Sequence, residues 1–347
     1  MVEQGVSAYS LYNKMLLPLV FNDLETDYEH LRSHVQIWDV ACERQVEIVG
    51  PDALALVELI TPRDISKCAI GQCMYAPLCD ENGGIMNDPI VLRLADDRFW
   101  LSLADSDTLL WVKGIAYGRG YDVQVFEPDV SPLGIQGPKA DDLMSDVVGE
   151  HVRDIGFFRF IETTIAGTDV ILARSGWSGQ GGFEVYLQDH RKGLDLWDVF
   201  WEAGQKYDIR SGGPNLIDRL ETGLKSYGSE MTIDSNPFES GLESFISLGK
   251  NAECMSRDAL LKISEEGPEK KLVNLVIEGE PLGSPRSVWN VVDGGVVTSQ
   301  AWSPSKKANL AFAIVDSGIA GVGSRLSVDA DGDLRGAVVC NSRWGVD

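Results

Sequence analysis

The residues best suited to chemistry in this sequence are the polar pair Asn87-Asp88 and the phenol of Tyr75. They belong to Gly71 to Leu94, which reads as a strand, a tight turn and a second strand. The turn holds Asp80-Glu81-Asn82-Gly83-Gly84, residue types that tolerate a positive φ. Because the turn aims the pair back toward Tyr75, we expect the Asp88 carboxylate to meet the phenol, as in a small-molecule site. An aspartate that caps the turn is the alternative.

A second polar segment, Arg174 to Leu187, reads RSGWSGQGGFEVYL. Its four glycines in seven residues predict a backbone that comes close to something flat, with Trp177 in the middle. Glu184 and Tyr186 then lie on one face of the following strand. A carboxylate inside an apolar strand requires hydrogen-bond donors, which favours a functional reading of Glu184. Trp177 taken alone could also be an ordinary core residue.

The elements that must position these groups alternate between helix and strand. Hydrophobic periodicity predicts helices over Asp23–His34, Ala53–Ile60, Thr108–Arg119, Asp141–Val148, Gly193–Tyr207 and Asn215–Tyr227. It predicts strands over Ile37–Val49, Trp100–Ala104, Pro132–Ile135, Glu162–Ile165 and Thr168–Ala173. Residues 8–21 are aromatic and apolar, so we expect them against the core or in a pocket wall.

A Gly-Pro pair occurs twice between a strand and a helix, at Gly50-Pro51 and Gly137-Pro138. The recurrence indicates two related α+β halves, unless a common turn has recurred by chance. From Pro268 the pattern changes to short alternating strands, which predict a small antiparallel, barrel-like domain. The expected domains are residues 1–130, 131–267 and 268–347. The strands expected in the last of these are Lys271–Ile277, Ser287–Val291, Gly295–Thr298, Leu310–Ile314, Arg325–Val328 and Gly336–Val339.

Composition limits the partners. The chain has 347 residues, 44% of them hydrophobic, which is enough for two or three packed domains. Its 53 acidic and 30 basic residues give a formal charge of −23, so nucleic acids and anionic membranes are poor partners. The six cysteines lack the spacing of a zinc site or a disulfide scaffold. The N-terminal segment resembles neither a signal peptide nor a membrane span, and we expect a cytoplasmic protein.

Several common catalytic motifs are absent from the sequence. There is no GxGxxG after a first strand, no P-loop and no GxSxG. The four histidines, His30, His34, His151 and His190, are not expected to converge on a metal, and His30 and His34 are expected to be solvated. Any catalysis therefore needs a diffusible cofactor, or only acid, base and positioning groups.

Taken together, the motifs resemble a known family. The series YNKMLLP, TPRDIS, IQGPK, SGWSGQGGFEVY and PNLIDRLETGLKSYG is similar to the tetrahydrofolate-dependent dimethylsulfoniopropionate demethylases. These belong to the superfamily of the aminomethyltransferase, or T-protein, of the glycine cleavage system. The likeness covers nearly the whole chain, and its combination of motifs is specific although each motif is weak.

The resemblance implies an α+β fold of three subdomains around a central folate channel, with a C-terminal barrel-like domain. Where the T-protein has two adjacent aspartates after the hairpin glycines, this chain has Asn87 and Asp88. Tetrahydrofolate is the expected methyl acceptor, and a homodimer is expected. The residues expected from the combined pattern are Asp88 and Tyr75 for catalysis, Trp177, Tyr12 and Met15 for the substrate, and Glu184, Tyr186, Arg219 and Tyr75 for folate.

The resemblance favours transfer of one S-methyl group from a dimethylsulfonium to N5 of tetrahydrofolate. A sulfonium leaves as a neutral thioether, so no general acid is needed and the enzyme has to align the reactants and exclude water. Aromatic walls suit the cation. Two alternatives stay open: a folate-dependent enzyme acting on a methylated amine or glycine derivative, and a folate-binding protein without catalysis.

Overall fold

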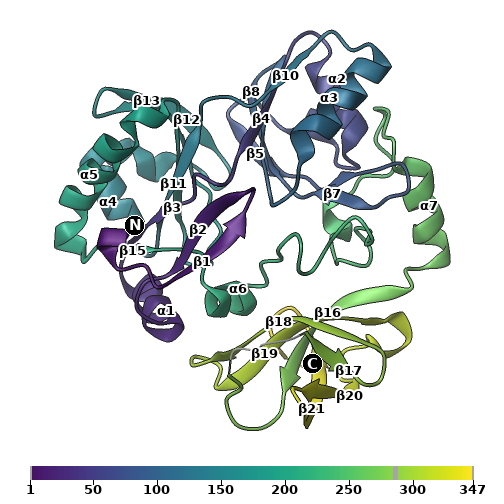
Figure 1. Cartoon of the computed structure of the whole chain (residues 1–347). Coiled ribbons are helices and arrows are strands. Elements are labelled where there is room, and N and C mark those ends of the chain that lie inside the picture. Colours follow the sequence, from purple (N-terminus) through teal and green to yellow (C-terminus); the bar gives the residue numbers. More distant parts are fainter. Residues whose placement is uncertain (1, 284–287, 346–347) are drawn as a thin grey trace.

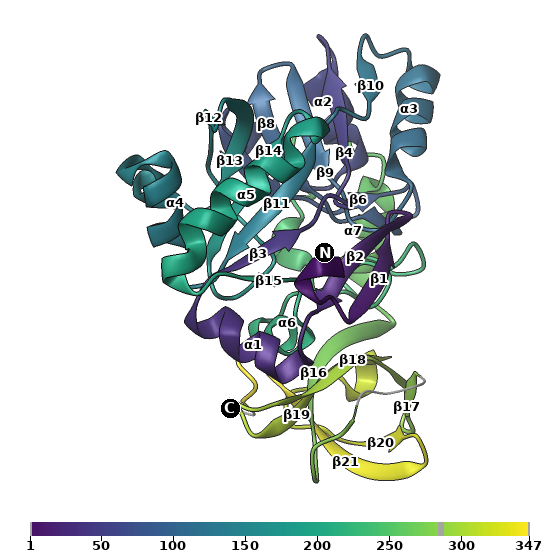
Figure 2. The same cartoon turned by 60° about the vertical axis from the view of Figure 1, so that its left-hand side comes forward.

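The computed structural model describes residues 2–283 and 288–345 of the chain. Figure 1 shows three lobes, with helix α6 (Leu216–Thr222) between them, and the turned view in Figure 2 places the C-terminal lobe below α6 as well. Each lobe has its own buried apolar cluster. None of the helices in the described residues has the length and apolar character that crossing a membrane requires.

The first lobe is built on an antiparallel sheet of β4 (Gln45–Val49), β5 (Gln72–Tyr75), β8 (Ile90–Ala95), β9 (Arg98–Ser102) and β10 (Gln124–Phe126). The strand order is β10-β4-β9-β8-β5. Helices α2 (Ala53–Ile60) and α3 (Thr108–Arg119) contribute to its core and have the bounds expected from the sequence. Two short strands, β6 (Leu78–Cys79) and β7 (Ile85–Asn87), pair with each other next to this sheet.

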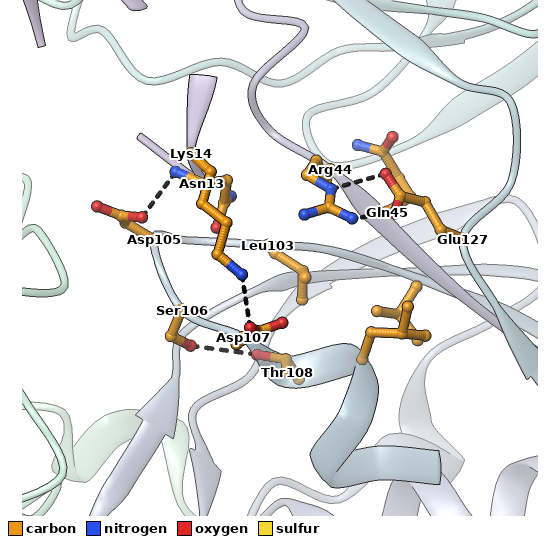
Figure 3. Close-up of a pocket in the computed structure, with 12 residues that line it drawn as sticks. Asn13, Lys14, Arg44, Gln45, Leu103, Asp105, Ser106, Asp107, Thr108 and Glu127 are labelled. Atoms are coloured by element: carbon orange, nitrogen blue, oxygen red, sulfur yellow. Dashed lines mark hydrogen bonds and ion pairs between the residues drawn. The ribbon is translucent and has the colours of Figure 1, made fainter. Parts of the chain in front are cut away.

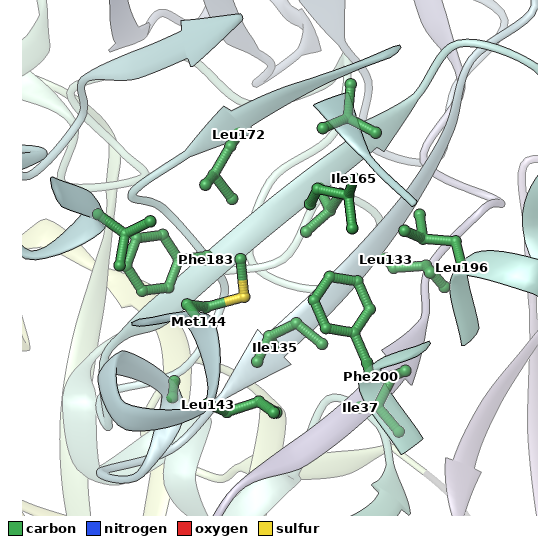
Figure 4. Packing of buried hydrophobic residues seen from close by; sticks show 14 of the residues in the cluster. Ile37, Leu133, Ile135, Leu143, Met144, Ile165, Leu172, Phe183, Leu196 and Phe200 are labelled. Carbon is green, nitrogen blue, oxygen red and sulfur yellow. The ribbon is translucent and has the colours of Figure 1, made fainter. Parts of the chain in front are cut away.

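The second lobe contains a six-stranded sheet in the order β12-β13-β14-β11-β3-β15. Its strands are β3 (Gln36–Asp39), β11 (Ser131–Gln136), β12 (Phe160–Ile165), β13 (Thr168–Ala173), β14 (Gly182–Leu187) and β15 (Arg210–Gly212). Helices α4 (Ala140–Val148) and α5 (Gly193–Gly204) pack on one face, where Met144, Phe183 and Phe200 interdigitate (Figure 4). These side chains bury apolar surface that stabilises the sheet at about 25 cal/mol per Å².

The segment predicted as one strand over Ile37–Val49 is broken into β3 and β4. The reason is long-range pairing, because β3 lies between β11 and β15 of the second sheet and β4 lies between β9 and β10 of the first. A single straight strand cannot pair in both sheets, so the chain turns at residues 40–44. The division at residue 130 stays a prediction, although β3 lies in the second sheet.

The C-terminal strands close into an antiparallel barrel, as predicted. Its order is β16-β19-β18-β17-β20-β21, so no strand edge is left unpaired. The strands are β16 (Lys270–Ile277), β17 (Trp289–Val291), β18 (Gly295–Ser303), β19 (Ala308–Asp316), β20 (Arg325–Ala330) and β21 (Asp333–Cys340). Ser287, the predicted start of β17, lies outside the described residues.

The N-terminal segment forms a hairpin of β1 (Ala8–Tyr12) and β2 (Met15–Val20), followed by helix α1 (Leu24–Ser33). The side chain of Asp23 caps α1 by accepting from the backbone N–H of Thr26 at 2.8 Å, as its residue type predicts. The expectation that residues 8–21 lie against the core holds for one face only. Leu17 is buried, whereas Leu11 is 68% exposed.

The two Gly-Pro junctions share a backbone conformation. Gly50 has a φ of +141° and Gly137 a φ of +120°, and each stands between a strand and a helix. A Cβ on Gly50 would lie 2.5 Å from the Asp122 carbonyl oxygen, and one on Gly137 2.4 Å from that of His34. Only glycine fits both positions without strain. The related conformation supports the predicted duplication, which stays a prediction.

The helix predicted over Asn215–Tyr227 is shorter than expected. The Asn215 side chain caps α6 as an acceptor for the backbone N–H of Ile217 at 3.0 Å. The helix ends where Gly223 adopts a left-handed φ of +79°. Beyond it the chain runs between the lobes to helix α7 (Arg257–Glu266) and the barrel.

A buried lysine fastens this connecting segment to the first lobe. Lys250 pairs with the Glu58 carboxylate, and its Nζ donates to the carbonyls of Thr61 (2.7 Å) and Arg63 (2.9 Å) just beyond the end of α2. Both charged side chains are almost fully buried. The ammonium also lies near the negative end of the helix dipole.

Lys250→Met should lower the free energy of unfolding by about 3–5 kcal/mol, because it leaves the Glu58 carboxylate buried without its cation. Urea denaturation followed by tryptophan fluorescence measures the change. Lys262→Met is the matched control, since Lys262 is exposed and its contact with Glu266 is 4.0 Å long. Equal stabilities of the two variants would contradict the role given to Lys250.

Candidate active site

The predicted turn brings a phenol and a carboxylate together. Asp80 Oδ1 accepts a hydrogen bond from the backbone N–H of Gly84 at 2.8 Å, which closes the turn between β6 and β7. The chain then returns as β8 alongside β5. The Tyr75 hydroxyl donates to Oδ2 of Asp88 at 2.9 Å. The predicted meeting of Asp88 and Tyr75 is confirmed, and Asp80 rather than Asp88 caps the turn.

Asp88 has an unusual acidity. Burial raises the pKa of its carboxyl to about 7, with a smaller contribution from the negative charge of Glu230, while the hydrogen bond from Tyr75 acts in the opposite direction. Burial also raises the pKa of Tyr75 well above its ordinary value. Near neutral pH the Asp88 side chain therefore exchanges between acid and carboxylate, and it can accept or release a proton.

Asn87 positions Asp88 by tying β7 to the loop after β9. Its side-chain Nδ2 donates to the Ala104 carbonyl at 3.0 Å and to the Ser106 hydroxyl at 2.8 Å. Its Oδ1 accepts from the Ala104 N–H at 3.0 Å. An aspartate at this position could not donate to the carbonyl. The Asn87 amide is thus fully hydrogen-bonded within the protein, and Asp88 is the acid of the pair.

The tip of the β1–β2 hairpin forms another wall of the region. Asn13 and Lys14 both have positive φ, as a two-residue hairpin turn requires. The Asn13 side chain donates to the Cys42 carbonyl at 3.0 Å. In Figure 3 Lys14 reaches Asp107, and Arg44 turns toward Glu127. The hairpin tip therefore docks onto both the crossing loop 40–44 and the first lobe.

Tyr12, at the end of β1, lies near two carboxylates. Its side chain is half-buried, and burial raises its pKa well above the ordinary value. The negative charges of Glu43 and Asp88 act in the same direction. Both carboxylates are therefore within electrostatic reach of the phenol. Tyr12 thus lies in the same region as Asp88, as the sequence led us to expect.

Glu184 on β14 is buried with two hydroxyl donors. The Tyr186 hydroxyl donates to its Oε2 at 3.1 Å, and Ser175 donates to the same oxygen. Burial raises the pKa of Glu184, while these two donors act against the rise. Burial and the charge of Glu184 raise the pKa of Glu43 well above its usual range. The carboxyl groups of Glu184 on β14 and Glu43 on the crossing loop are thus within electrostatic reach of each other.

Three glycines of the glycine-rich segment lie against neighbouring protein groups. A Cβ on Gly176 would lie 2.2 Å from the Gln136 side chain, and one on Gly179 2.0 Å from that of Thr222. A Cβ on Gly182 would lie 2.2 Å from the Ile135 carbonyl. These three glycines therefore allow close approach to β11 and α6, whereas a Cβ on Gly181 would meet nothing within 4 Å. The predicted approach of this backbone to a flat ligand stays a prediction.

Trp177 is held by a cation that also contacts the barrel. The Arg219 guanidinium carbon lies 5.7 Å from the centroid of the Trp177 ring and 5.7 Å from that of Phe312. Its Nη2 donates to Glu230 at 2.7 Å and to Ser299 at 2.6 Å. Within the part of the chain that the structure describes, its buried Nε has no hydrogen-bond partner.

Tyr75 and Tyr12 are the predicted site residues with a direct link to Asp88 among the described residues, and Met15 has no such link. It lies opposite Tyr12 in the hairpin, and its side chain is 43% exposed.

The sequence analysis also missed residues that the structure brings to the region. The Phe245 ring contacts the Tyr75 ring edge-on, with 4.7 Å between the ring centroids. Burial and, to a smaller extent, the negative charge of Asp88 raise the pKa of Tyr227.

Glu43 was missed because residues 37–49 were interpreted as one strand. The polar pair Glu43-Arg44 interrupts the apolar pattern there, and this break is the feature that marks the crossing loop. For Phe245 and Tyr227 no local pattern in the sequence indicates proximity to Asp88. Their positions depend on how the connecting segment runs between the lobes.

The histidines were also predicted incorrectly in part. His30 is only 4% exposed, and its Nε2 lies 2.8 Å from the carbonyl of Asp208. Its ring stacks on His34 at 5.0 Å, and both approach the Asp208 carboxylate. Arg210 pairs with that carboxylate at 2.9 Å. Because these polar atoms already have protein partners, we interpret the cluster as a polar network that joins α1 to β15.

Comparison with known proteins gives a consistent result. The family model described as the GCVT N-terminal domain matches residues 1–250, and the glycine cleavage T-protein C-terminal barrel domain matches residues 270–344. The dimethylsulfoniopropionate demethylase DmdA of Ruegeria pomeroyi is 45% identical over 98% of this chain and 94% of its own length. An aminomethyltransferase of Thermoanaerobacter sp. is 30% identical over 90% of this chain and 86% of its own.

A solved structure shares the fold. The glycine cleavage system aminomethyltransferase T from Bartonella henselae superposes with a TM-score of 0.88 over 99% of this chain and 95% of that one, at 24% identity. The predicted α+β fold with a C-terminal barrel is confirmed by this likeness and by the two family models.

The raised pKa of Asp88 predicts a pH-dependent effect of Asp88→Asn on stability. The pKa of Asp88 is about 7 in the folded protein and about 3.9 in the unfolded chain. The contribution of this group to the free energy of unfolding is therefore fully present below about pH 4, and it is lost as the pH rises through 7. At pH 8 the variant should exceed the wild type by about 2–4 kcal/mol in free energy of unfolding, and the excess should shrink on acidification.

Urea denaturation from pH 5 to pH 8 measures this difference. Glu43 and Glu184 titrate in both proteins, so subtracting the two curves isolates Asp88. A difference that is constant across the pH range would show that the Asp88 carboxyl has an ordinary acidity in the folded protein.

Proposed function

The chain belongs to the glycine cleavage T-protein family, and from this membership we propose that it is a folate-dependent methyltransferase, a dimethylsulfoniopropionate demethylase. The reaction moves one S-methyl group to N5 of tetrahydrofolate and releases methylmercaptopropionate. The observation that carries this choice is the 45% identity over 98% of the chain to a demethylase, compared with 30% over 90% to an aminomethyltransferase. The motif resemblance leads to the same reaction.

The buried charges support a cationic donor. Asp88, Glu43 and Glu184 come from three different segments, and among the described residues none of them has a cation as a partner. The nearby guanidinium of Arg219 is neutralised by Glu230. Carboxylates held away from water without a cation nearby are costly, and a bound cation offsets that cost. A sulfonium is such a cation, and Trp177 and Tyr12 offer it aromatic faces.

The residues also suit a folate. The pterin ring carries N–H donors, for which Asp88 and Glu184 are acceptors. The buried Nε of Arg219, which lacks a partner among the described residues, is a donor for an oxygen of the p-aminobenzoyl-glutamate portion. Tetrahydrofolate supplies the nitrogen that receives the methyl group. We assign Glu184, Tyr186, Arg219 and Tyr75 to its binding.

The side chains of this protein have to accept one proton and orient the reactants. The donor's S–CH3 bond breaks as the new N–CH3 bond forms, and the leaving thioether is neutral, so no side chain has to protonate it. The methylated nitrogen gives up its proton, and Asp88, with a pKa of about 7, can take it. Tyr75 orients this carboxyl through the 2.9 Å hydrogen bond. Trp177, Tyr12 and Met15 are assigned to the donor.

The setting of the reaction is part of the proposal. We infer a cytoplasmic enzyme of sulfur metabolism that works as a homodimer on small molecules, without nucleic acid or membrane partners. The formal charge of −23 supports the exclusion of anionic polymers and surfaces. The dimer rests on the family resemblance, and light scattering of the purified protein measures it directly.

A single-turnover assay should show the reaction itself. Protein incubated anaerobically with tetrahydrofolate and dimethylsulfoniopropionate should form 5-methyltetrahydrofolate and methylmercaptopropionate in equal amounts. Asp88→Ala should slow the step by about 100-fold, within the range for loss of an acid–base group. If the wild type forms neither product, the sulfonium assignment is wrong, and dimethylglycine and other methylated amines are the next donors to test.

Replacement of Trp177 should separate donor binding from folate binding. Loss of a desolvated cation–π contact of ~1–2 kcal/mol should raise KM for the sulfonium by about 5–30-fold in Trp177→Leu and less in Trp177→Phe. The folate dissociation constant, measured by fluorescence, should change little. Trp201→Phe is the matched control, because Trp201 stacks on Trp197 along α5 away from the site. Equal losses for sulfonium and folate would place Trp177 against the folate instead.

A further inference from the structure

Glu230 is a fully buried carboxylate on the connecting segment after α6, and the proposed reaction does not use it. Its Oε2 accepts from Nη2 of Arg219 at 2.7 Å and from the backbone N–H of Ser226 at 2.8 Å. Its Oε1 accepts from the hydroxyls of Thr298 at 2.9 Å and Ser299 at 2.6 Å. Each oxygen thus has two donors, and the carboxylate is fixed by α6, by the connecting segment and by β18.

The contacts of Arg219 with the protein use one of its three guanidinium nitrogens. Nη2 donates to Glu230 and to the hydroxyl of Ser299, and the same hydroxyl donates to Glu230. Nε is buried and has no hydrogen-bond partner in the part of the chain that the structure describes. Because the guanidinium is a rigid plane, fixing Nη2 also fixes the direction of the Nε–H bond.

Aromatic rings restrain the same guanidinium without fixing its orientation. Its carbon lies 5.7 Å from the centroid of the Trp177 ring, on the glycine-rich segment, and 5.7 Å from that of Phe312, on β19. These contacts depend on the distance between the cation and each ring. A charge-assisted hydrogen bond adds directional specificity, so the bond to Glu230 determines how the guanidinium is turned.

We propose that Glu230 is a positioning residue that turns the Arg219 guanidinium so that its Nε–H donates to the p-aminobenzoyl-glutamate portion of tetrahydrofolate. The inference deepens the proposed function and rests on it, because it assumes that Arg219 binds folate. A buried donor without a partner is unfavourable, and an oxygen of the folate removes that cost. Since Glu230 balances the charge of Arg219, recognition depends on the direction of one hydrogen bond more than on net charge.

Two ligands distinguish this role from that of an ion pair that only joins the connecting segment to the barrel. Tetrahydrofolate has the p-aminobenzoyl-glutamate portion, whereas 6-methyltetrahydropterin has the reduced ring and N5 but lacks that portion. Binding of each is measured anaerobically by calorimetry, without a methyl donor, so that no turnover occurs. The wild type should bind tetrahydrofolate more tightly than the pterin.

Glu230→Gln should weaken tetrahydrofolate binding by about 10–100-fold, as expected for loss of a hydrogen bond to a charged group. Binding of 6-methyltetrahydropterin should change by less than about 3-fold, because the pterin does not reach Arg219. Glu221→Gln is the matched control, since the Glu221 carboxylate also connects α6 to β18, but through Ser303. It should keep the wild-type affinities for both ligands.

A second comparison removes the buried charges together, because Glu230→Gln alone leaves a buried guanidinium without its anion and is expected to lower stability. In Arg219→Met the Glu230 carboxylate keeps three donors. Arg219→Met/Glu230→Gln replaces the whole pair, which is less costly than breaking it. If Glu230 acts through Arg219, these two variants should bind tetrahydrofolate with equal affinity.

The outcomes separate this role from the proposed function. Unchanged tetrahydrofolate binding in Glu230→Gln, or equal weakening of both ligands, would overturn the positioning role. Weaker binding by the double variant than by Arg219→Met would overturn it as well, because Glu230 would then act without Arg219. A wild type that binds both ligands equally would overturn it together with the assignment of Arg219 to folate. A wild type that binds neither ligand would contradict the proposed function itself.

Discussion

The central constraint on this structure is the burial of carboxyl groups without cations beside them. Asp88, Glu43 and Glu184 each cost free energy to hold in a protein interior. Hydroxyl donors from Tyr75, Ser175 and Tyr186 offset part of this cost for two of them. The remainder is sustained by the apolar cores of the lobes, which fix the strands and loops on which these residues stand. The free-energy cost of holding these carboxyl groups is therefore met by the whole fold and not by one loop.

Local residue chemistry was enough to predict several parts of this arrangement. The hairpin with Asp80 and Gly84, the cap at Asp23 and the bounds of α2 and α3 depend on neighbours in the sequence, and all are confirmed. The closed barrel also follows from alternation and turns. The contact of Tyr75 with Asp88 could be predicted because a hairpin fixes which residues return toward each other.

Other features depend on contacts far apart in the sequence and were not predictable in this way. The break between β3 and β4 exists because two different sheets recruit the two halves of one apolar run. The same break places Glu43 within electrostatic reach of Tyr12 and Glu184. His30 is buried because a distant carbonyl at Asp208 lies against it. The glycines near Trp177 serve contacts with β11 and α6, which the sequence of the loop does not reveal.

Arg219 connects the site to the end of the chain. It joins the ring of Trp177, on the second lobe, to Ser299 and Phe312 in the barrel. During synthesis both sheets emerge from the ribosome well before these barrel strands do. The wall that holds Trp177 can be completed only when the last eighth or so of the protein is being made. A nascent or C-terminally truncated chain would therefore have the hairpin acid in place, while the Arg219 side chain beside Trp177 would still lack its contacts with the barrel.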